Sequence, residues 1–102
     1  MTTHVLKTDP EVFCAVFNGK KKFEIRLNDR DFQVGDTLLL RETQFTGADM
    51  RAGAPLIYTD RELKVIVTYI LHGQIYGLAE NWCIMSIRIP FVASKVLREG
   101  AA

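Results

Sequence analysis

The sequence has few of the residues that build metal sites or disulfide frameworks. It contains two cysteines, Cys14 and Cys83, and two histidines, with no CxxC or Cys/His spacing of the kind that binds zinc. Cys14 falls in a predicted amphipathic helix and Cys83 in an apolar strand, so both are expected to be small core residues in a reducing compartment. We therefore expect no metal and no other cofactor.

Long hydrophobic runs and a large excess of one charge are also absent. No apolar stretch reaches the roughly 18 to 20 residues that a membrane-spanning helix needs. The first residues lack the apolar centre of a signal peptide, so a cytoplasmic location without a membrane partner is the default expectation. The formal net charge is +1, which argues against a protein that coats duplex DNA, because such domains are usually strongly basic. A small basic cleft that reads one nucleotide or a short RNA loop is still compatible with this charge.

The chain does have enough apolar sequence for one core. Its 102 residues are 48% hydrophobic and 25% charged, which fits a single domain and leaves no room for two. We expect this domain to cover residues 1–99, with residues 100–102 as a frayed tail. The sequence does not indicate an oligomeric state.

The predicted elements follow the order strand, helix and four further strands. After a first strand at residues 5–7, the helix starts either with a capping box from Thr8 to Glu11 or with a cap at Asp9 followed by Pro10. Apolar residues at helical spacing follow, and Gly19 ends the helix. This order predicts an α+β fold, a small barrel with a helix packed at its side. Further strands are expected at 20–28, 37–42, 62–72 and 82–89, an irregular loop at 43–60 and a short helix at 91–99.

In two of these strands, apolar residues recur at every second position. Phe23, Ile25 and Leu27 alternate with polar residues, which predicts a strand with a buried apolar face and an exposed polar face. In the strand at 62–72, alternate apolar residues are expected on one buried face, and this spacing places Tyr69 in the core.

The most informative residues are Lys21, Glu24 and Arg26. Arg26 carries a planar fork suited to a phosphate or a base edge. Glu24 can accept a hydrogen bond from an exocyclic amine or act as a base, and Lys21 supplies positive charge. By strict alternation Lys21 would lie on the other side of the strand, so it joins the pair only if the strand begins after it. The alternative is an ordinary solvated face, because lysines after a helix C-terminus are favoured by the helix dipole.

The pattern Gly19-x-Lys21-x-x-Glu24-x-Arg26 resembles the signature of the ASCH domain, a relative of the PUA fold. Segments 28–36, 40–42, 58–62 and 67–73 resemble a small ASCH subfamily of bacteria and phages without an assigned function, in which position 60 is usually glycine. The resemblance covers residues 4–89. It implies a small PUA-like β-barrel of five to six mostly antiparallel strands with a helix at its side. It also implies a cleft between helix and strands that binds RNA, a nucleotide or a modified nucleoside.

Other ASCH branches are similar to enzymes. One resembles small amidohydrolases that deacylate N(4)-acetylcytidine, and another resembles a ribonuclease. The amidohydrolases match this chain at Lys21 and Arg26, but their nucleophilic threonine falls at Glu24, and Glu80 is the nearest match to their catalytic glutamate. The first hypothesis is therefore a binding module, and the second is a metal-independent hydrolase with Glu24 or Glu80 as base and Lys21 holding the oxyanion. A third is an interaction protein, which an exposed apolar patch on the 43–60 loop would favour.

Five further residues are candidate ligand contacts. His4 is suited to acid–base chemistry near neutral pH, although a surface position at a strand end is the simpler interpretation. Tyr58 and Trp82 could stack on a base, which is worth about 1 to 3 kcal/mol. Lys7 and Arg41 could contact phosphate.

Overall fold

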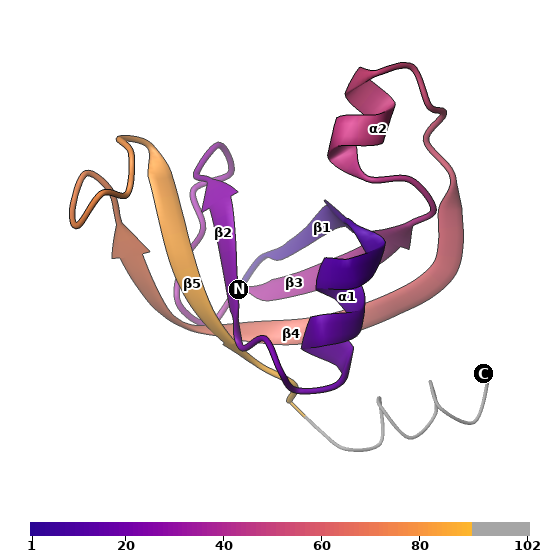
Figure 1. Ribbon diagram of the computed structural model, residues 1–102. Coiled ribbons are helices and arrows are strands. Elements are labelled where there is room, and N and C mark those ends of the chain that lie inside the picture. The colour runs from indigo at the N-terminus through magenta and orange to yellow at the C-terminus, as the bar shows by residue number, and fades with distance from the viewer. Residues whose placement is uncertain (91–102) are drawn as a thin grey trace.

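Five strands form one curled sheet, a half-barrel, in the computed structural model, which describes residues 1–90 (Figure 1). The strand order is β1-β3-β4-β5-β2, in which β1 and β3 are parallel and the other three pairs antiparallel. No helix in this range is long and apolar enough to cross a membrane. The elements are β1 (Thr3–Thr8), α1 (Pro10–Phe17), β2 (Phe23–Leu27), β3 (Thr37–Thr43), α2 (Gly47–Arg51), β4 (Tyr58–His72) and β5 (Trp82–Arg88).

The predicted order of one strand, one helix and four strands is found, with one further helix, α2, inserted between β3 and β4. Helix α1 begins with Pro10 at its first position and Asp9 as the N-cap residue, so of the two predicted starts the proline start is the one formed. The helix is followed by Gly19, whose φ of 75° is available to glycine without steric cost. The helix expected at 91–99 and the tail at 100–102 lie outside the described residues.

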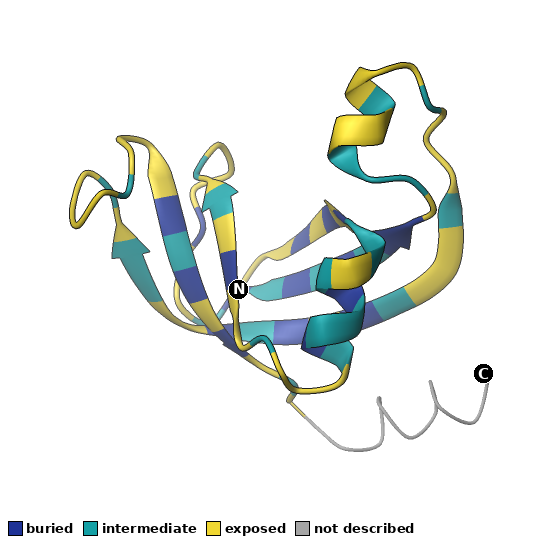
Figure 2. Cartoon of the chain, in the orientation of Figure 1, coloured by how far each residue is buried: buried dark blue, intermediate teal, exposed yellow. Residues whose placement is uncertain are grey.

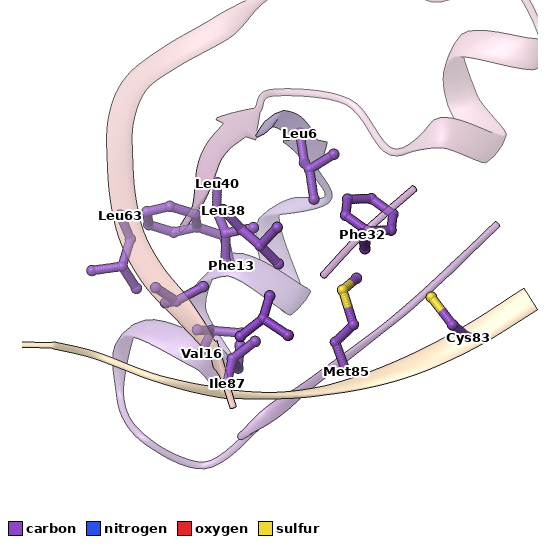
Figure 3. Packing of buried hydrophobic residues seen from close by; sticks show 12 residues of the cluster. Leu6, Phe13, Val16, Phe32, Leu38, Leu40, Leu63, Cys83, Met85 and Ile87 are labelled. Atoms are coloured by element: carbon purple, nitrogen blue, oxygen red, sulfur yellow. The ribbon is translucent and has the colours of Figure 1, made fainter. Parts of the chain in front are cut away.

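The hydrophobic core lies inside the curl, where α1 packs next to β3 (Figure 1). Figure 2 shows the alternation of buried and less buried residues along β5, as expected for a strand with one face on the core. Figure 3 shows the side chains of the core meeting between the helix and the sheet. The core consists of Leu6, Phe13, Val16, Phe32, Leu38, Leu40, Leu63, Val65, Val67, Cys83, Met85 and Ile87.

The prediction that Tyr69 belongs to the core is wrong. Leu63, Val65 and Val67 are buried as expected, but the pairing of β4 with β5 shifts register between Val67 and Tyr69. Such a bulge places an extra residue in one strand, so the side chains beyond it change faces. Tyr69 is consequently 62% exposed on the outer face of the sheet.

The segment at 43–60 is less irregular than predicted, because it contains α2. Thr46 and Asp49 form a capping box, in which Thr46 Oγ1 accepts from the Asp49 N–H at 3.0 Å and the Asp49 carboxylate accepts from the Thr46 N–H at 3.2 Å. The Asp9 carboxylate accepts a hydrogen bond from the Gly47 N–H at 2.9 Å. This contact ties the start of α2 to the start of α1. The Thr-x-x-Asp spacing was the sequence signal for this helix.

His4 is buried, so the expectation of a surface histidine is wrong. Its Nε2 lies 2.8 Å from Asp36 Oδ2, and its ring packs edge-on against Phe32. The Asp36 carboxylate also accepts from the Gln33 and Thr2 N–H groups. Burial on its own would raise the pKa of Asp36, but the hydrogen bonds from His4, Thr2 and Gln33 outweigh it and hold the pKa below its ordinary value of 3.8.

Asp36 should therefore make the free energy of unfolding depend on pH in the acid range. A folded-state pKa below the unfolded value stabilises the fold above about pH 4, and this contribution is lost as the pH falls through the lowered folded pKa. We expect Asp36→Asn to cost about 1–3 kcal/mol at pH 7 and progressively less below pH 4. Urea unfolding at several pH values measures this, and a cost that stays constant down to pH 2.5 would contradict the assignment.

Candidate functional site

Strand β2 turns its charged side chains inward and its apolar side chains outward. Glu24 is 2% exposed, whereas Phe23, Ile25 and Leu27 are 41–46% exposed. The prediction that the apolar face is buried is therefore wrong. The reason is the position of β2 at one end of the strand order, where its inner face meets β1 across an opening, and where charged groups find hydrogen-bond partners.

Three side chains meet on this inner face. Lys21 Nζ lies 2.6 Å from Glu24 Oε2, and Arg26 donates to Glu24 Oε1 from Nε at 3.1 Å and from Nη2 at 2.9 Å. Because β2 begins at Phe23, Lys21 precedes the strand and is free of its alternation. The structure thus brings together the three residues that the spacing singled out, and we call them the charged triad.

Arginine side chains link the two free edges of the sheet. Arg26 Nη1 donates to the Lys7 carbonyl at 3.1 Å and Nη2 contacts Thr8 Oγ1 at 3.4 Å, while Arg30 Nη1 donates to the Val5 carbonyl at 2.7 Å. The strands β1 and β2 stand at opposite ends of the strand order, so each has an edge without a strand partner. These contacts satisfy carbonyls of the β1 edge and hold the two edges at a fixed separation.

A cleft of about 890 Å³ opens along this seam. Its walls come from β1, the start of α1, β2 with the turn that follows it, and α2. The volume is near the upper end of the roughly 300–1,000 Å³ typical of small-molecule sites. Five basic side chains line it, Lys7, Lys21, Arg26, Arg30 and Arg51, against three acidic ones, Asp9, Glu24 and Asp29, so its lining is net positive.

The hydrogen bonds of the triad decide what each member can still do. Both Glu24 oxygens accept from a cation, and the side chain is 2% exposed. Arg26 uses four of its five N–H groups and Lys21, which also donates to the Phe23 carbonyl, uses two of three, so each keeps one donor without a partner among the described residues. Glu24 therefore acts as an anchor, and the two cations are the members able to meet a ligand.

Two cleft cations have no partner within residues 1–90, the Lys7 ammonium and the Arg51 guanidinium. Both side chains are exposed, one on β1 and the other at the end of α2. Sequence reasoning missed Arg51, because its place at the cleft depends on the capped helix α2 and on the contact between Asp9 and Gly47. The Thr46–Asp49 capping box was the one available signal for it.

The structure places only part of the remaining candidate contacts at the cleft. Lys7 and Trp82 line it, and Trp82 is 40% exposed. His4 does not, because it faces Asp36 in the interior. Glu80 is exposed in the loop before β5 and does not line the cleft.

Arg41 and Tyr58 interact with each other away from the cleft. The Arg41 guanidinium lies 3.6 Å from the centroid of the Tyr58 ring, and its Nε lies 2.9 Å from a Glu62 carboxylate oxygen. Neither Arg41 nor Tyr58 lines the cleft. Both side chains are already engaged on the strands β3 and β4, which explains their position without a ligand.

The molecule is thus a small α+β protein whose half-barrel carries a net positive cleft at its open seam. The family model described as "Domain of unknown function (DUF3850)" matches residues 3–87, and the chain belongs to this family. The matched range contains every residue that lines the cleft. No curated protein matches the chain.

Glu24 and Arg26 should contribute a large interaction free energy to the stability of the fold. Removing one partner of a buried pair leaves an uncompensated charge, which typically costs about 3–5 kcal/mol. We expect Arg26→Gln to destabilise the fold by about this amount, and Glu24→Gln/Arg26→Gln to cost clearly less than the sum of the single substitutions. Urea unfolding of the four proteins measures the coupling.

The exposed pair Asp29 and Arg30, whose charged atoms lie 3.9 Å apart, provides a matched control. The same cycle with Asp29→Asn and Arg30→Gln should give a coupling below about 1 kcal/mol. Equal couplings in the two cycles would show that Glu24 is not the anchor.

Proposed function

We propose that the chain is a PUA-like domain of the ASCH type that binds a nucleotide or an unpaired RNA base in the cleft. The observation that carries the proposal is the net positive cleft, in which a buried glutamate holds Lys21 and Arg26 in place. Because folding already fixes both side chains, a ligand would not have to order them, which favours affinity. Each offers one remaining hydrogen-bond donor to an oxygen of a phosphate or a base.

The free cations and the rings of the cleft suit the same ligand. Lys7 and Arg51 are available to phosphate oxygens. Phe23 and Trp82 are each about 40% exposed beside the cleft, and base stacking on an aromatic ring is worth about 1–3 kcal/mol. One bound base needs only a local basic surface, which agrees with a net charge of +1.

The ASCH assignment is supported by the conformation of its signature residues. Gly19 has a φ of 75°, which a residue with a side chain rarely adopts, and Lys21, Glu24 and Arg26 form one cluster. Asp60, where the resembling subfamily usually has glycine, has a φ of 71°. This positive φ explains why glycine is usual at position 60 of the subfamily. Aspartate is among the few other residues that tolerate a positive φ.

The contacts favour binding over hydrolysis. Of the two candidate general bases, Glu24 is buried with both oxygens occupied and Glu80 lies outside the cleft. A general base must come within hydrogen-bond reach of the proton it removes. Neither carboxylate meets this condition for a ligand in the cleft.

The proposal predicts a specific effect of the two free cations. Lys7→Gln/Arg51→Gln should weaken binding of a short single-stranded RNA. It should also make the slope of log binding constant against log salt concentration less negative by about 0.7 per lost phosphate contact. Both side chains are exposed, so the melting temperature should change little. Fluorescence anisotropy with labelled RNA over a salt series measures the effect.

The matched control is Lys20→Gln/Lys64→Gln, which removes the same charge from exposed positions outside the cleft. Equal losses in the two variants would refute a binding site at the cleft, as would an absence of binding to RNA and cytidine monophosphate. Deacylation of N(4)-acetylcytidine or cleavage of the RNA by the wild-type protein would assign a hydrolase instead.

A further inference from the structure

The outer face of β2, β5 and β4 carries a continuous apolar surface. The register of β2 with β5 sets Ile25 opposite Ile84 and Leu27 opposite Trp82. Residues directly opposite each other in an antiparallel pair point to the same side of the sheet. On β4, beyond the bulge, Tyr69 continues this side. We call Phe23, Ile25, Leu27, Trp82, Ile84 and Tyr69 the apolar face.

The apolar face is open to solvent and carries no charge. Five of its six residues are at least 40% exposed, and Ser86, which pairs with Phe23, is its polar neighbour. In Figure 1 both helices lie to the right of β2 and β5, away from the end of β4. Monomeric proteins seldom expose a contiguous apolar surface larger than a few hundred Å² unless it binds something.

The end of this face where β2 begins is basic. Lys22 and Arg88 are both exposed there. The Ile87 N–H donates to the Lys22 carbonyl at 3.0 Å, so Lys22 lies beside the end of β5 that carries Arg88. Neither side chain has a partner within residues 1–90. This end therefore offers two free positive charges.

The opposite end is acidic. The hydrogen bond from the Asn28 N–H to the Asn81 carbonyl at 2.7 Å brings the exposed residues Asp29 and Glu80 to that end. Asp29 already faces Arg30, whereas Glu80 has no partner in the described part of the chain. At about 3.3 Å per residue along β5, Glu80 and Arg88 lie roughly 26 Å apart.

We propose that the apolar face binds a second copy of this chain, face to face and with antiparallel strands. A two-fold axis that lies between the two sheets and perpendicular to the strands places Glu80 of one copy near the partner's Arg88. By symmetry the reverse pair forms at the other end. The uncharged centre then meets an equal surface of the same kind, and the charged ends are complementary.

The dimer depends on other contacts than the proposed function does, although the apolar face and the cleft share a border. The charged triad lies on the other side of β2 and stays open to the cleft. Phe23, Ile25, Leu27 and Trp82 also line the cleft, so the partner copy would lie along its rim. Glu80 and Arg88 do not line the cleft, so substitutions at these two residues separate loss of the dimer from loss of RNA binding.

Sedimentation equilibrium of the full chain tests the proposal. The mass should rise from 11.6 kDa toward twice that value as the protein concentration increases. Ile25→Thr/Tyr69→Thr retains β-strand propensity at two exposed positions and should raise the dimer dissociation constant about tenfold or more. The control Leu56→Thr/Ile57→Thr removes exposed apolar side chains outside the face and should leave the constant unchanged.

A charge-reversal cycle tests the antiparallel arrangement. Glu80→Lys and Arg88→Glu should each weaken the dimer, and the double variant should recover most of the wild-type dissociation constant, because the pair is re-formed with its signs exchanged. Circular dichroism confirms that each variant is folded. A wild-type chain that stays monomeric at all concentrations, a dimer insensitive to Ile25→Thr/Tyr69→Thr, or a cycle without recovery would each overturn the proposal.

Discussion

The burial of Glu24 between Lys21 and Arg26 is the interaction on which the seam of this half-barrel depends. A carboxylate removed from water costs several kcal/mol unless its charge and its lone pairs are satisfied. Here three hydrogen bonds from two cations satisfy it. The same arrangement fixes Arg26 so that it reaches the Lys7 carbonyl on β1. The distance between the two free sheet edges, and with it the cleft, follows from this pairing.

The reversed orientation of β2 has a second consequence. Because its charged residues point inward, its apolar residues point outward and extend the apolar face of β5. One edge strand thus borders two surfaces of opposite character, a positive cleft inside and an uncharged apolar face outside. The proposed ligand uses the first surface and the proposed partner copy the second, with Phe23 and Trp82 at their common border. This arrangement connects the nucleotide-binding hypothesis with the alternative of an interaction protein. An apolar patch on the 43–60 segment would favour that alternative; Leu56 and Ile57 are exposed there, whereas the more extended apolar face lies on the sheet.

Much of the architecture could be predicted from the sequence, because local signals specify it. Pro10 and Gly19 mark the ends of α1, and the spacing of Lys21, Glu24 and Arg26 predicts their meeting once the strand begins at Phe23. Alternation cannot say which face of a strand is buried, because a period of two is the same for either orientation. That choice depends on strand order, and for β2 the edge position decided it.

Other features depended on contacts between distant residues. The bulge that turns Tyr69 outward arises in the pairing of β4 with β5, and the position of Arg51 requires α2 to contact Asp9. His4 was predicted at the surface because its partner, Asp36, lies 32 residues away in sequence. The positions of Arg41, Tyr58 and Glu80 away from the cleft likewise could not be predicted from local patterns.

Locating the ligand on the protein would show whether the cleft is its binding site. We would titrate isotope-labelled protein with cytidine monophosphate and with a short single-stranded RNA, and follow the backbone amides together with the Arg26 Nε–H group by nuclear magnetic resonance. The account predicts shifts at Arg26, Phe23 and Arg51 and none at Lys64 on the far part of β4. Shifts confined to residues outside the cleft, or no shifts with either ligand, would contradict it.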